Sequence, residues 1–285
     1  MKVLITGSHG FVGTNLIETL DSTCDIIRWD AREDKALPEC DAVIHLAGKA
    51  HDTKNTTLEE EYYKVNTDLT KKIFDAFLES KAKKYLFFSS IKAKDNDTPY
   101  ARSKKTAEDY ILSNTNITND TNKRIYILRP CMIHGKGVKG NLPLLFKFVK
   151  SGWPWPLAAF ENKRSYASIE NVSFVVNELL KKNVESGIYS ICDDESISTN
   201  VLIRLMSECI GIKPKMISLP KSVVRLGAKL GDLLHLPLNT ERLIKLTENN
   251  VVDNSEIKKV LGINYMPVKA MDGLKTSIRE LLKND

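Results

Sequence analysis

Three glycines spaced three residues apart separate a short β-branched run from a helix-like segment, and this arrangement constrains the fold most. The run Lys2–Thr6 has the character of a buried strand, and Phe11–Leu20 follows it with helical spacing. Gly7 supplies a tight turn, Gly10 allows a ligand to approach the backbone, and Gly13 allows the helix to pack on the strand. Because a helix N-terminus presents N–H groups to phosphate, this segment predicts a dinucleotide site.

An acidic residue after the next strand candidate bears on which dinucleotide fits. Asp30 follows Asp25–Trp29, seventeen positions after Gly13, where a carboxylate suits the ribose hydroxyls of NAD and repels a 2′-phosphate. Arg32 could neutralise such a phosphate, so NADP stays possible, and an ordinary surface acid is the alternative interpretation of Asp30. The cofactor contacts predicted from this part of the chain are Gly7, Ser8, His9, Gly10, Phe11, Val12, Gly13, Asp30 and Arg32.

Short apolar runs alternate with helix-like segments through the first half of the chain. Further strand candidates are Ala42–Leu46, Tyr85–Phe88 and Ile125–Leu128, and helix candidates are Glu59–Ser80 and Ser103–Ser113. Because these runs are apolar throughout, they predict a parallel sheet covered by helices on both faces. The expected fold class is therefore α/β, a Rossmann-type doubly wound parallel sheet. His45, inside one of the runs, is interpreted as a core histidine with satisfied hydrogen bonds.

The amino-acid composition changes after about Lys136. A Gly-, Pro- and Trp-rich stretch precedes helix candidates at Asn171–Lys182, Ser198–Ile210, Val223–Leu234 and Met271–Leu282. We expect residues 1–135 to form the NAD(P)-binding core, and residues 136–285 to form mainly a small C-terminal substrate-binding cap interwoven with the core sheet. Within it, Ser222–Leu236 is typical of an amphipathic surface helix, although its basic residues and leucines leave contact with a membrane or partner open.

Composition and charge exclude several other functions. The net charge of +6 is spread along the chain, so it indicates no nucleic acid partner and is compatible with an anionic small ligand. No apolar run approaches the roughly 20 residues that span a bilayer, so we expect no stable membrane insertion; the N-terminal apolar stretch is also too short for a signal peptide. The five cysteines form no CxxC pair and no metal-ligand spacing, which indicates reduced thiols in a cytoplasmic protein without a metal site.

Tyr100 and Lys104 lie four residues apart at the start of a predicted helix, so their side chains share one face. A free tyrosine has a pKa of about 10, and a nearby ammonium lowers it by stabilising the phenolate. Such a pair can exchange a proton with a carbonyl or alcohol oxygen while a nicotinamide exchanges hydride. Because this spacing is common by chance, the interpretation depends on the glycine loop and on Ser89 and Ser90, which follow a buried strand candidate.

Together these motifs resemble the extended short-chain dehydrogenase/reductase family, and more narrowly its NAD-dependent epimerase/dehydratase branch, which acts on nucleotide sugars. The resemblance is carried by Thr6–Gly13 (TGxxGxxG), Asp41–Gly48, Asn66 in VNTDLT, Ser89-Ser90 and Tyr100–Lys104. It extends over nearly the whole chain through Leu128–Pro130, Gly140-Asn141 and Lys163–Tyr166. The stretches HLAGKAH, SSIK and GVKGN look most like bacterial 4-ketoreductases or 4-epimerases of surface-polysaccharide biosynthesis.

The resemblance implies a role for each matching residue. Tyr100 would be the proton donor or acceptor, Ser90 would hydrogen-bond the substrate C4 oxygen, and Lys104 would bind the nicotinamide ribose and tune Tyr100. Further cofactor contacts are implied for Leu46, Ala47, Gly48, Asn66, Ser89, Pro130 and Cys131. Substrate contacts are implied for His51, Ser90, Met132, Asn141 and Arg164; Asn141 would contact the nucleotide and Arg164 the diphosphate, to which arginine forms bidentate bonds.

The function expected from these residues is an NAD(P)-dependent 4-ketoreductase acting at C4 of a nucleotide-diphosphate sugar, with a UDP-linked sugar as the expected substrate. One alternative is a UDP-sugar 4-epimerase, which uses the same groups twice, and another is a non-catalytic NAD(P)-binding regulator. A dehydratase is disfavoured because Ile91 and Lys92 follow Ser90, where the resembled dehydratases have an acid pair. The resemblance also implies a homodimer through the helices at Glu59–Ser80 and Ser103–Ser113.

Two segments are short for this family. Ten residues separate Asp30 from Asp41, which leaves little room for the usual third strand and helix. Nine residues separate Ser90 from Tyr100, where a longer loop is usual. Asn96, Asp97 and Pro99 are residues that turn the chain tightly, so we expect a compact connection there.

Overall fold

The computed structural model describes residues 1–20, 22–32, 36–49, 57–95, 97–114, 122–234 and 239–283. They form two compact units, each built from three stretches of chain. The first unit comprises Met1–Cys131, Ile169–Cys192 and Asp253–Pro267, and the second comprises Met132–Ser168, Asp193–Val252 and Val268–Asp285. The first unit therefore takes two of its three stretches from the half of the chain beyond residue 135.

The first unit is organised around a six-stranded sheet in the order β2-β1-β3-β4-β5-β8. Every neighbouring pair of strands in it is parallel. The strands are β1 (Lys2–Thr6), β2 (Asp25–Trp29), β3 (Ala42–His45), β4 (Lys84–Phe88), β5 (Arg124–Pro130) and β8 (Gly187–Ile191). This arrangement confirms the predicted Rossmann-type parallel sheet.

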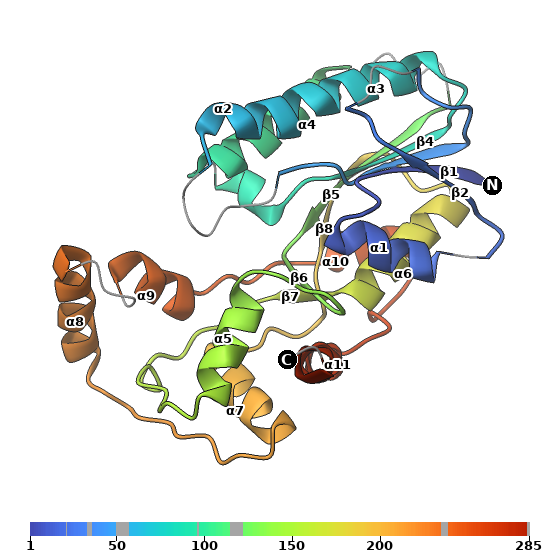
Figure 1. Cartoon of the computed structure of the whole chain (residues 1–285). Coiled ribbons are helices and arrows are strands. Elements are labelled where there is room, and N and C mark those ends of the chain that lie inside the picture. Colours follow the sequence, from blue (N-terminus) through green and yellow to red (C-terminus); the bar gives the residue numbers. More distant parts are fainter. Residues whose placement is uncertain are drawn as a thin grey trace. The chain divides into compact units, whose positions relative to one another are not determined.

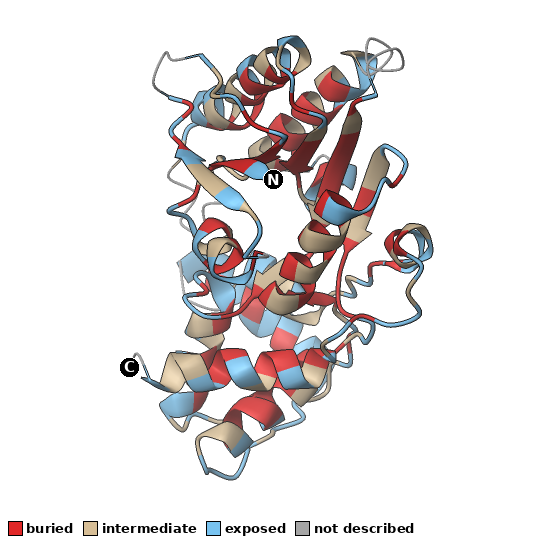
Figure 2. Cartoon of the chain, turned by 90° about the vertical axis from the view of Figure 1, so that its right-hand side faces the viewer, coloured by how far each residue is buried: buried red, intermediate tan, exposed pale blue. Residues whose placement is uncertain are grey.

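The strands are apolar along their length because helices cover the sheet from both sides. All four residues of β3 are buried, and Tyr85, Leu86 and Phe87 of β4 are fully inaccessible. Figure 2 shows the central strands as almost continuously buried. β2 is more exposed because it lies at an edge of the sheet. This pattern is the one expected for a sheet packed on both faces.

Helices cover both faces of this sheet (Figure 1). On one face lie α2 (Glu59–Tyr62), α3 (Leu69–Glu79) and α4 (Pro99–Asn114), and on the other lie α1 (Phe11–Thr19) and α6 (Ile169–Lys181), which contact each other. α10 (Ser255–Leu261) contacts β8. The segment predicted as one helix over Glu59–Ser80 contains a π-helical stretch, η1 (Tyr63–Asp68), between α2 and α3. Such stretches are frequent at functional sites.

The strand order reverses beside β1, which lies between β2 and β3. In open α/β sheets, ligands bind at such a reversal, outside the carboxyl ends of the strands. In the connection between β2 and β3, the described residues 30–32 and 36–41 contain no strand. The third strand that usually extends this side of the sheet is therefore not formed by them, in agreement with the short spacing from Asp30 to Asp41.

The second unit contains a small parallel sheet and helices. β6 (Met132–His134) pairs with β7 (Tyr166–Ser168), and the helices are α5 (Asn141–Lys150), α7 (Thr199–Cys209), α8 (Lys221–Leu234), α9 (Thr240–Thr247) and α11 (Ala270–Lys283). His134 Nδ1 lies 2.8 Å from Ser277 Oγ, and His134 Nε2 lies 3.4 Å from Asp193 Oδ2. All three side chains are buried, and the cluster joins β6 to α11.

Candidate active site

The glycine loop between β1 and α1 leaves no room for side chains at two of its glycines. Gly7 has a φ of +68°, and a Cβ there would lie 2.7 Å from the Ala47 backbone nitrogen. A Cβ on Gly13 would collide with the Gly7 carbonyl and lie 2.8 Å from Ser8 Cα. Gly10 begins α1 without a side-chain capping bond, so the first-turn N–H groups are left to another acceptor. These features suit a phosphate at the helix N-terminus.

Asp30 and Arg32, predicted at the adenosine end of the cofactor, pair with each other. Arg32 donates from Nε to Asp30 Oδ1 at 2.9 Å and from Nη2 to Oδ2 at 2.6 Å. These bonds lower the pKa of Asp30 to about 2, so its carboxylate is charged at any physiological pH. Both side chains are exposed, so their oxygens and N–H groups can exchange partners with a ribose or a phosphate at little cost.

Asn66 holds the loop that follows β3. From the π-helical stretch η1, its Oδ1 accepts the Lys49 N–H at 2.7 Å, and its Nδ2 donates to the Lys49 carbonyl at 3.1 Å. Nδ2 also donates to Ser103 Oγ of α4 at 3.0 Å. Asn66 is therefore a buried amide that fixes the backbone beside Gly48.

His45 links the carboxyl ends of β1 and β3 to the start of α3. Burial lowers its pKa to about 3, so the ring is neutral. Thr70 donates to the Asn66 carbonyl and therefore accepts from His45 Nε2, 2.9 Å away. His45 Nδ1 then accepts from Thr6 Oγ1 at 2.7 Å, and this oxygen accepts the Ala47 N–H at 3.1 Å. As expected, His45 is a satisfied core histidine, but its partners also fix the loop that contains Ala47.

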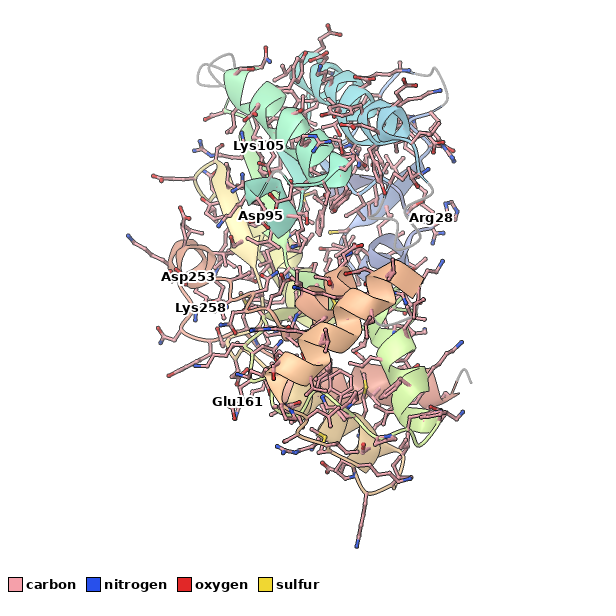
Figure 3. The ribbon with its side chains drawn as sticks, turned by 90° about the vertical axis from the view of Figure 1, so that its left-hand side faces the viewer. Arg28, Asp95, Lys105, Glu161, Asp253 and Lys258 are labelled. Carbon is pink, nitrogen blue, oxygen red and sulfur yellow. The ribbon has the colours of Figure 1, made fainter. Side chains whose placement is uncertain are left out.

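Lys104 brings a buried amine to the same edge of the sheet. Its Nζ donates to the Phe88 carbonyl at the end of β4 at 2.8 Å. A Cβ on Gly48 would lie 3.1 Å from this nitrogen, so the loop passes close to the amine. Burial lowers the pKa of Lys104 to about 8, against the opposing effect of Glu108. The neighbouring Lys105 lies on the surface of α4 (Figure 3) and pairs with Asp109.

Tyr100 and Ser90 meet despite the short connection between them. Ser90 begins the 3-10 helix η2 (Ile91–Lys94), where its Oγ accepts the Lys92 N–H at 3.2 Å. The half-buried Tyr100 shares a side-chain hydrogen bond with Ser90, and its ring lies edge-on to Tyr62, with 6.1 Å between centroids. Only nine residues separate the two, yet they come within hydrogen-bonding reach.

The acidity of Tyr100 differs from the expectation that an ammonium lowers it. Burial raises the pKa of Tyr100, and the hydrogen bond with Ser90 is the influence that opposes it. The Lys104 amine, in turn, donates to the Phe88 carbonyl. At neutral pH the phenol is therefore protonated.

Further predicted residues surround this edge. Ser89, at the carboxyl end of β4, has a buried Oγ with no hydrogen-bond partner among the described residues. Pro130 ends β5 and is buried, and the adjacent Cys131 donates its N–H to the Ile191 carbonyl at 3.1 Å. The five cysteines, all among the described residues, are free.

Three of the other predicted substrate residues belong to the second unit. Met132 begins β6, Asn141 begins α5, and Arg164 lies between α5 and β7, so all three belong to the second unit. The Arg164 guanidinium donates to the Lys245 carbonyl, and its backbone pairs with Ile197. His51 lies outside the described residues.

Sequence reasoning missed one charged pair that supports the site. Glu108 lies one turn beyond Lys104 on α4 and is fully buried. Arg129 of β5 donates to it with Nε at 2.9 Å and with Nη2. The sequence did offer one signal for Glu108. It lies four residues after Lys104, and this spacing predicts that the two opposite charges share one helix face.

The first unit therefore fits a dinucleotide on three independent features. Glycines occupy the points where a Cβ would fill the cradle, the N-terminus of α1 lacks a side-chain cap, and the Ser89 hydroxyl lacks a partner. No cluster of three or more potential metal ligands occurs among the described residues. None of the described helices is both long and apolar enough to cross a membrane.

Comparison with known proteins places these features in a family. The model of the NAD dependent epimerase/dehydratase family matches residues 3–192, more than half of the chain. The chain belongs to this family. The family is NAD-dependent, so the predictions of an enzyme of this type and of a nicotinamide dinucleotide as its cofactor are confirmed.

Individual relatives are more distant. The chain is 27% identical to a UDP-glucose 4-epimerase from Vibrio cholerae over 324 aligned positions, which cover 99% of this chain and 96% of the relative. It is 33% identical to a UDP-2-acetamido-2,6-beta-L-arabino-hexul-4-ose reductase from Pseudomonas aeruginosa, over 50% of this chain and 38% of the relative. A crystal structure of UDP-glucuronic acid 4-epimerase from Bacillus cereus in complex with NAD has the same fold, with a TM-score of 0.74 and 18% identity over 99% of both chains.

The alignment with the Vibrio cholerae protein also bears on the short segments. Its 324 aligned positions exceed the 285 residues of this chain. The relative therefore has residues with no counterpart here, in agreement with a chain that is compact for its family.

Proposed function

We propose that this chain reduces a C4 ketone in a UDP-linked sugar at the expense of NADH or NADPH. The observation that carries the proposal is the Ser90–Tyr100 pair, in which a phenol with a pKa raised by burial shares a hydrogen bond with a serine hydroxyl. A phenol that is protonated at neutral pH begins the reaction as an acid, and reduction of a ketone requires an acid at its oxygen.

In the proposed reaction the side chains of this protein hold the sugar and move one proton. The Ser90 hydroxyl hydrogen-bonds the C4 oxygen, and the Tyr100 hydroxyl gives its proton to that oxygen as the ketone becomes an alcohol. A bound reduced nicotinamide supplies the hydride to C4. Lys104, whose pKa of about 8 leaves it charged at neutral pH, stabilises the phenolate that remains on Tyr100.

The remaining predicted residues have binding roles in the proposal. The loop Gly7–Gly13, Asp30, Leu46–Gly48, Asn66, Ser89, Pro130 and Cys131 hold the dinucleotide, with NAD favoured by the Asp30 carboxylate and NADP still open through Arg32. Asn141 and Arg164 hold the nucleotide and the diphosphate of the substrate, with His51 and Met132 close to the sugar. Arginine suits this task because its guanidinium forms two parallel bonds with phosphate oxygens.

A 4-epimerase is the second candidate, and one observation favours it. The match to a UDP-glucose 4-epimerase extends over 99% of this chain, whereas the match to a reductase covers 50%. An epimerase would need Tyr100 first as a base and then as an acid, with the cofactor restored at the end of each turnover. A regulator that binds NAD(P) without turnover is disfavoured, because it has no use for Ser90, Tyr100 and Lys104 together.

Incubation of the purified protein with UDP-4-keto sugars and UDP-sugars, with and without added NADH or NADPH, separates these functions. We expect consumption of reduced cofactor in proportion to the keto sugar, and NMR of the product should show a new hydrogen at C4. Interconversion of two UDP-sugars without net consumption would instead identify an epimerase. Tight binding of the dinucleotide with no change in any sugar would identify a regulator.

The proposal also covers the biosynthetic role, the cellular location and the oligomeric state of the enzyme. The resemblance supports a role in surface-polysaccharide biosynthesis, a cytoplasmic location and a homodimer through the helices at Glu59–Ser80 and Ser103–Ser113. Light scattering of the purified protein tests the dimer, and deletion of the gene, followed by sugar analysis of the surface polysaccharide, tests the biosynthetic role.

A further inference from the structure

Helix α8 (Lys221–Leu234) buries its small side chains and exposes its large ones. Val224 and Ala228 are buried, at 5% and 0% exposure, and Gly231 lies on the same face. Leu226, Leu230 and Leu233 are exposed by 62%, 50% and 74%. An ordinary amphipathic surface helix turns its leucines inward, so this helix does the reverse of what its sequence pattern predicts.

The exposed apolar residues form one continuous stripe. At 3.6 residues per turn, an arc of about 100° contains Val223, Leu226, Leu230, Leu233 and Leu234, all at least 50% exposed. The buried residues occupy a separate arc of about 60°. The helix therefore packs on its own unit with one narrow face and presents a leucine-rich face to its surroundings.

The rest of the helix circumference is mainly basic. Lys221, Arg225 and Lys229 occupy an arc of about 80° that borders the leucine stripe. The one acid of α8, Asp232, accepts the Thr240 N–H at 3.0 Å and the Thr240 hydroxyl at 2.5 Å, so it is engaged at the start of α9. The charge left beside the leucine stripe is therefore positive.

The second unit as a whole exposes more apolar surface than the first. Of the sixteen large hydrophobic side chains exposed in the described parts of the chain, twelve lie in the second unit. Ile217 and Leu219, which lead into α8, are 43% and 37% exposed. Scattered apolar residues on a surface need no explanation, but a stripe on one helix marks an interaction site.

We propose that α8 docks this protein on the surface of an anionic lipid bilayer. A leucine-rich face beside a lysine- and arginine-rich face is the composition of helices that lie in a membrane interface, with the apolar side in the acyl boundary and the cations at the headgroups. At 1.5 Å per residue its 14 residues extend about 21 Å, so it lies along the surface rather than across it. The positive stripe favours anionic lipid over an uncharged protein surface or over a second copy, whose own α8 would bring like charges together.

Vesicle flotation of the full chain tests this proposal. We expect binding to vesicles of phosphatidylcholine with about a third phosphatidylglycerol, little binding to phosphatidylcholine alone, and weaker binding at high salt. The triple variant Leu226→Ser, Leu230→Ser, Leu233→Ser should lose binding. Arg225→Gln with Lys229→Gln should weaken it roughly 30-fold, since each basic residue contributes about fivefold.

Matched controls separate docking from folding and from catalysis. Tyr265→Ser removes a side chain of the first unit that is 79% exposed, and it should bind vesicles like the wild type. The serine variant should keep its circular dichroism spectrum, its melting temperature and its rate with a soluble substrate, because the replaced leucines are not core residues. Equal flotation of the wild type and the serine variant, or no flotation of either, overturns the proposal. So does a wild-type dimer that the serine variant dissociates, because the stripe would then be an interface between copies.

Discussion

Tyr100 is protonated at neutral pH because burial raises the pKa of its phenol. Burial and the hydrogen bond with Ser90 act on its pKa in opposite directions, and burial is the larger effect. The i, i+4 spacing with Lys104 correctly predicted a shared helix face, but it could not predict that the amine is directed to the Phe88 carbonyl. That contact depends on the packing of α4 against the end of β4, which no local pattern encodes.

Replacement of Tyr100 by phenylalanine removes the proton donor while the ring and its packing on Tyr62 remain. We expect the rate of sugar reduction to fall by about 10²–10⁴-fold, the usual contribution of general acid catalysis. The affinity for the dinucleotide, measured by fluorescence titration, should change little. A rate like that of the wild type would remove Tyr100 from the mechanism.

Lys104 should leave a signature in the pH dependence of stability. Its pKa is about 8 in the folded chain and 10.5 in the reference state, so between these values the unfolded chain binds more protons. The contribution of Lys104 to the free energy of unfolding therefore rises with pH across this window, by up to about 3 kcal/mol. Urea unfolding between pH 7.5 and 10 should show that the wild type gains stability relative to Lys104→Met. Parallel pH profiles of the two proteins would contradict the lowered pKa.

At the scale of elements, the loop between β1 and α1 was the most predictable part of the site. Its glycines have a stereochemical reason that is visible in the sequence, and the structure supplies the atoms that they avoid, including the backbone of Ala47. The relay from Thr6 through His45 to Thr70 was predicted only in part, because its members come from β1, β3 and α3 and meet only when these elements pack. The π-helical stretch that contains Asn66 could not be predicted either, because the spacing of the apolar residues is that of an ordinary helix.

Gly13→Ala should disrupt the glycine loop, because the new Cβ would meet backbone atoms of Gly7 and Ser8 that cannot yield without moving the loop. We expect the affinity for NAD or NADP to fall at least tenfold, since small displacements at a site have effects of this order or larger. Gly227→Ala in α8 is the matched control, because no atom outside its own helix backbone and chain neighbours lies within 4 Å of the new Cβ. It should leave the affinity unchanged and raise the melting temperature, since alanine favours a helix by up to about 1 kcal/mol over glycine.

The pair of Glu108 and Arg129 joins α4 to β5. Arg129→Leu would leave the Glu108 carboxylate buried without a partner, so we expect the free energy of unfolding to fall by about 3–5 kcal/mol. The double variant Glu108→Met, Arg129→Leu should regain most of this loss, because two apolar side chains need no charge partner. Chemical denaturation of the three proteins measures the coupling. If the double variant is no more stable than Arg129→Leu, the loss comes from packing rather than from the charge.

For the whole molecule, the order of elements was more predictable than the division into units. The parallel sheet followed from apolar runs, but β8 (Gly187–Ile191), with its glycine, tyrosine and serine, did not stand out among them. α9 and α10 were also missed, since helices of eight and seven residues offer barely two turns of periodicity. The boundary predicted near residue 135 was based on a change in amino-acid composition. The first unit, however, also includes two later stretches of the chain.

These later stretches should be indispensable to the first unit. β8 pairs with β5 along its whole length, and α6 buries Val172, Val175, Val176 and Leu179 completely. A fragment of residues 1–135 lacks both elements, so β5 becomes an unpaired edge and the face that contacts α6 is exposed to water. We expect this fragment to show no cooperative unfolding transition and to bind no dinucleotide. A chain that joins residues 1–131, 169–192 and 253–267 by flexible linkers restores every strand and helix of the unit, and it should unfold cooperatively. If the 1–135 fragment melts cooperatively by itself, the sheet does not depend on its sixth strand, and the stability assigned here to β8 and α6 must come from the five strands before them.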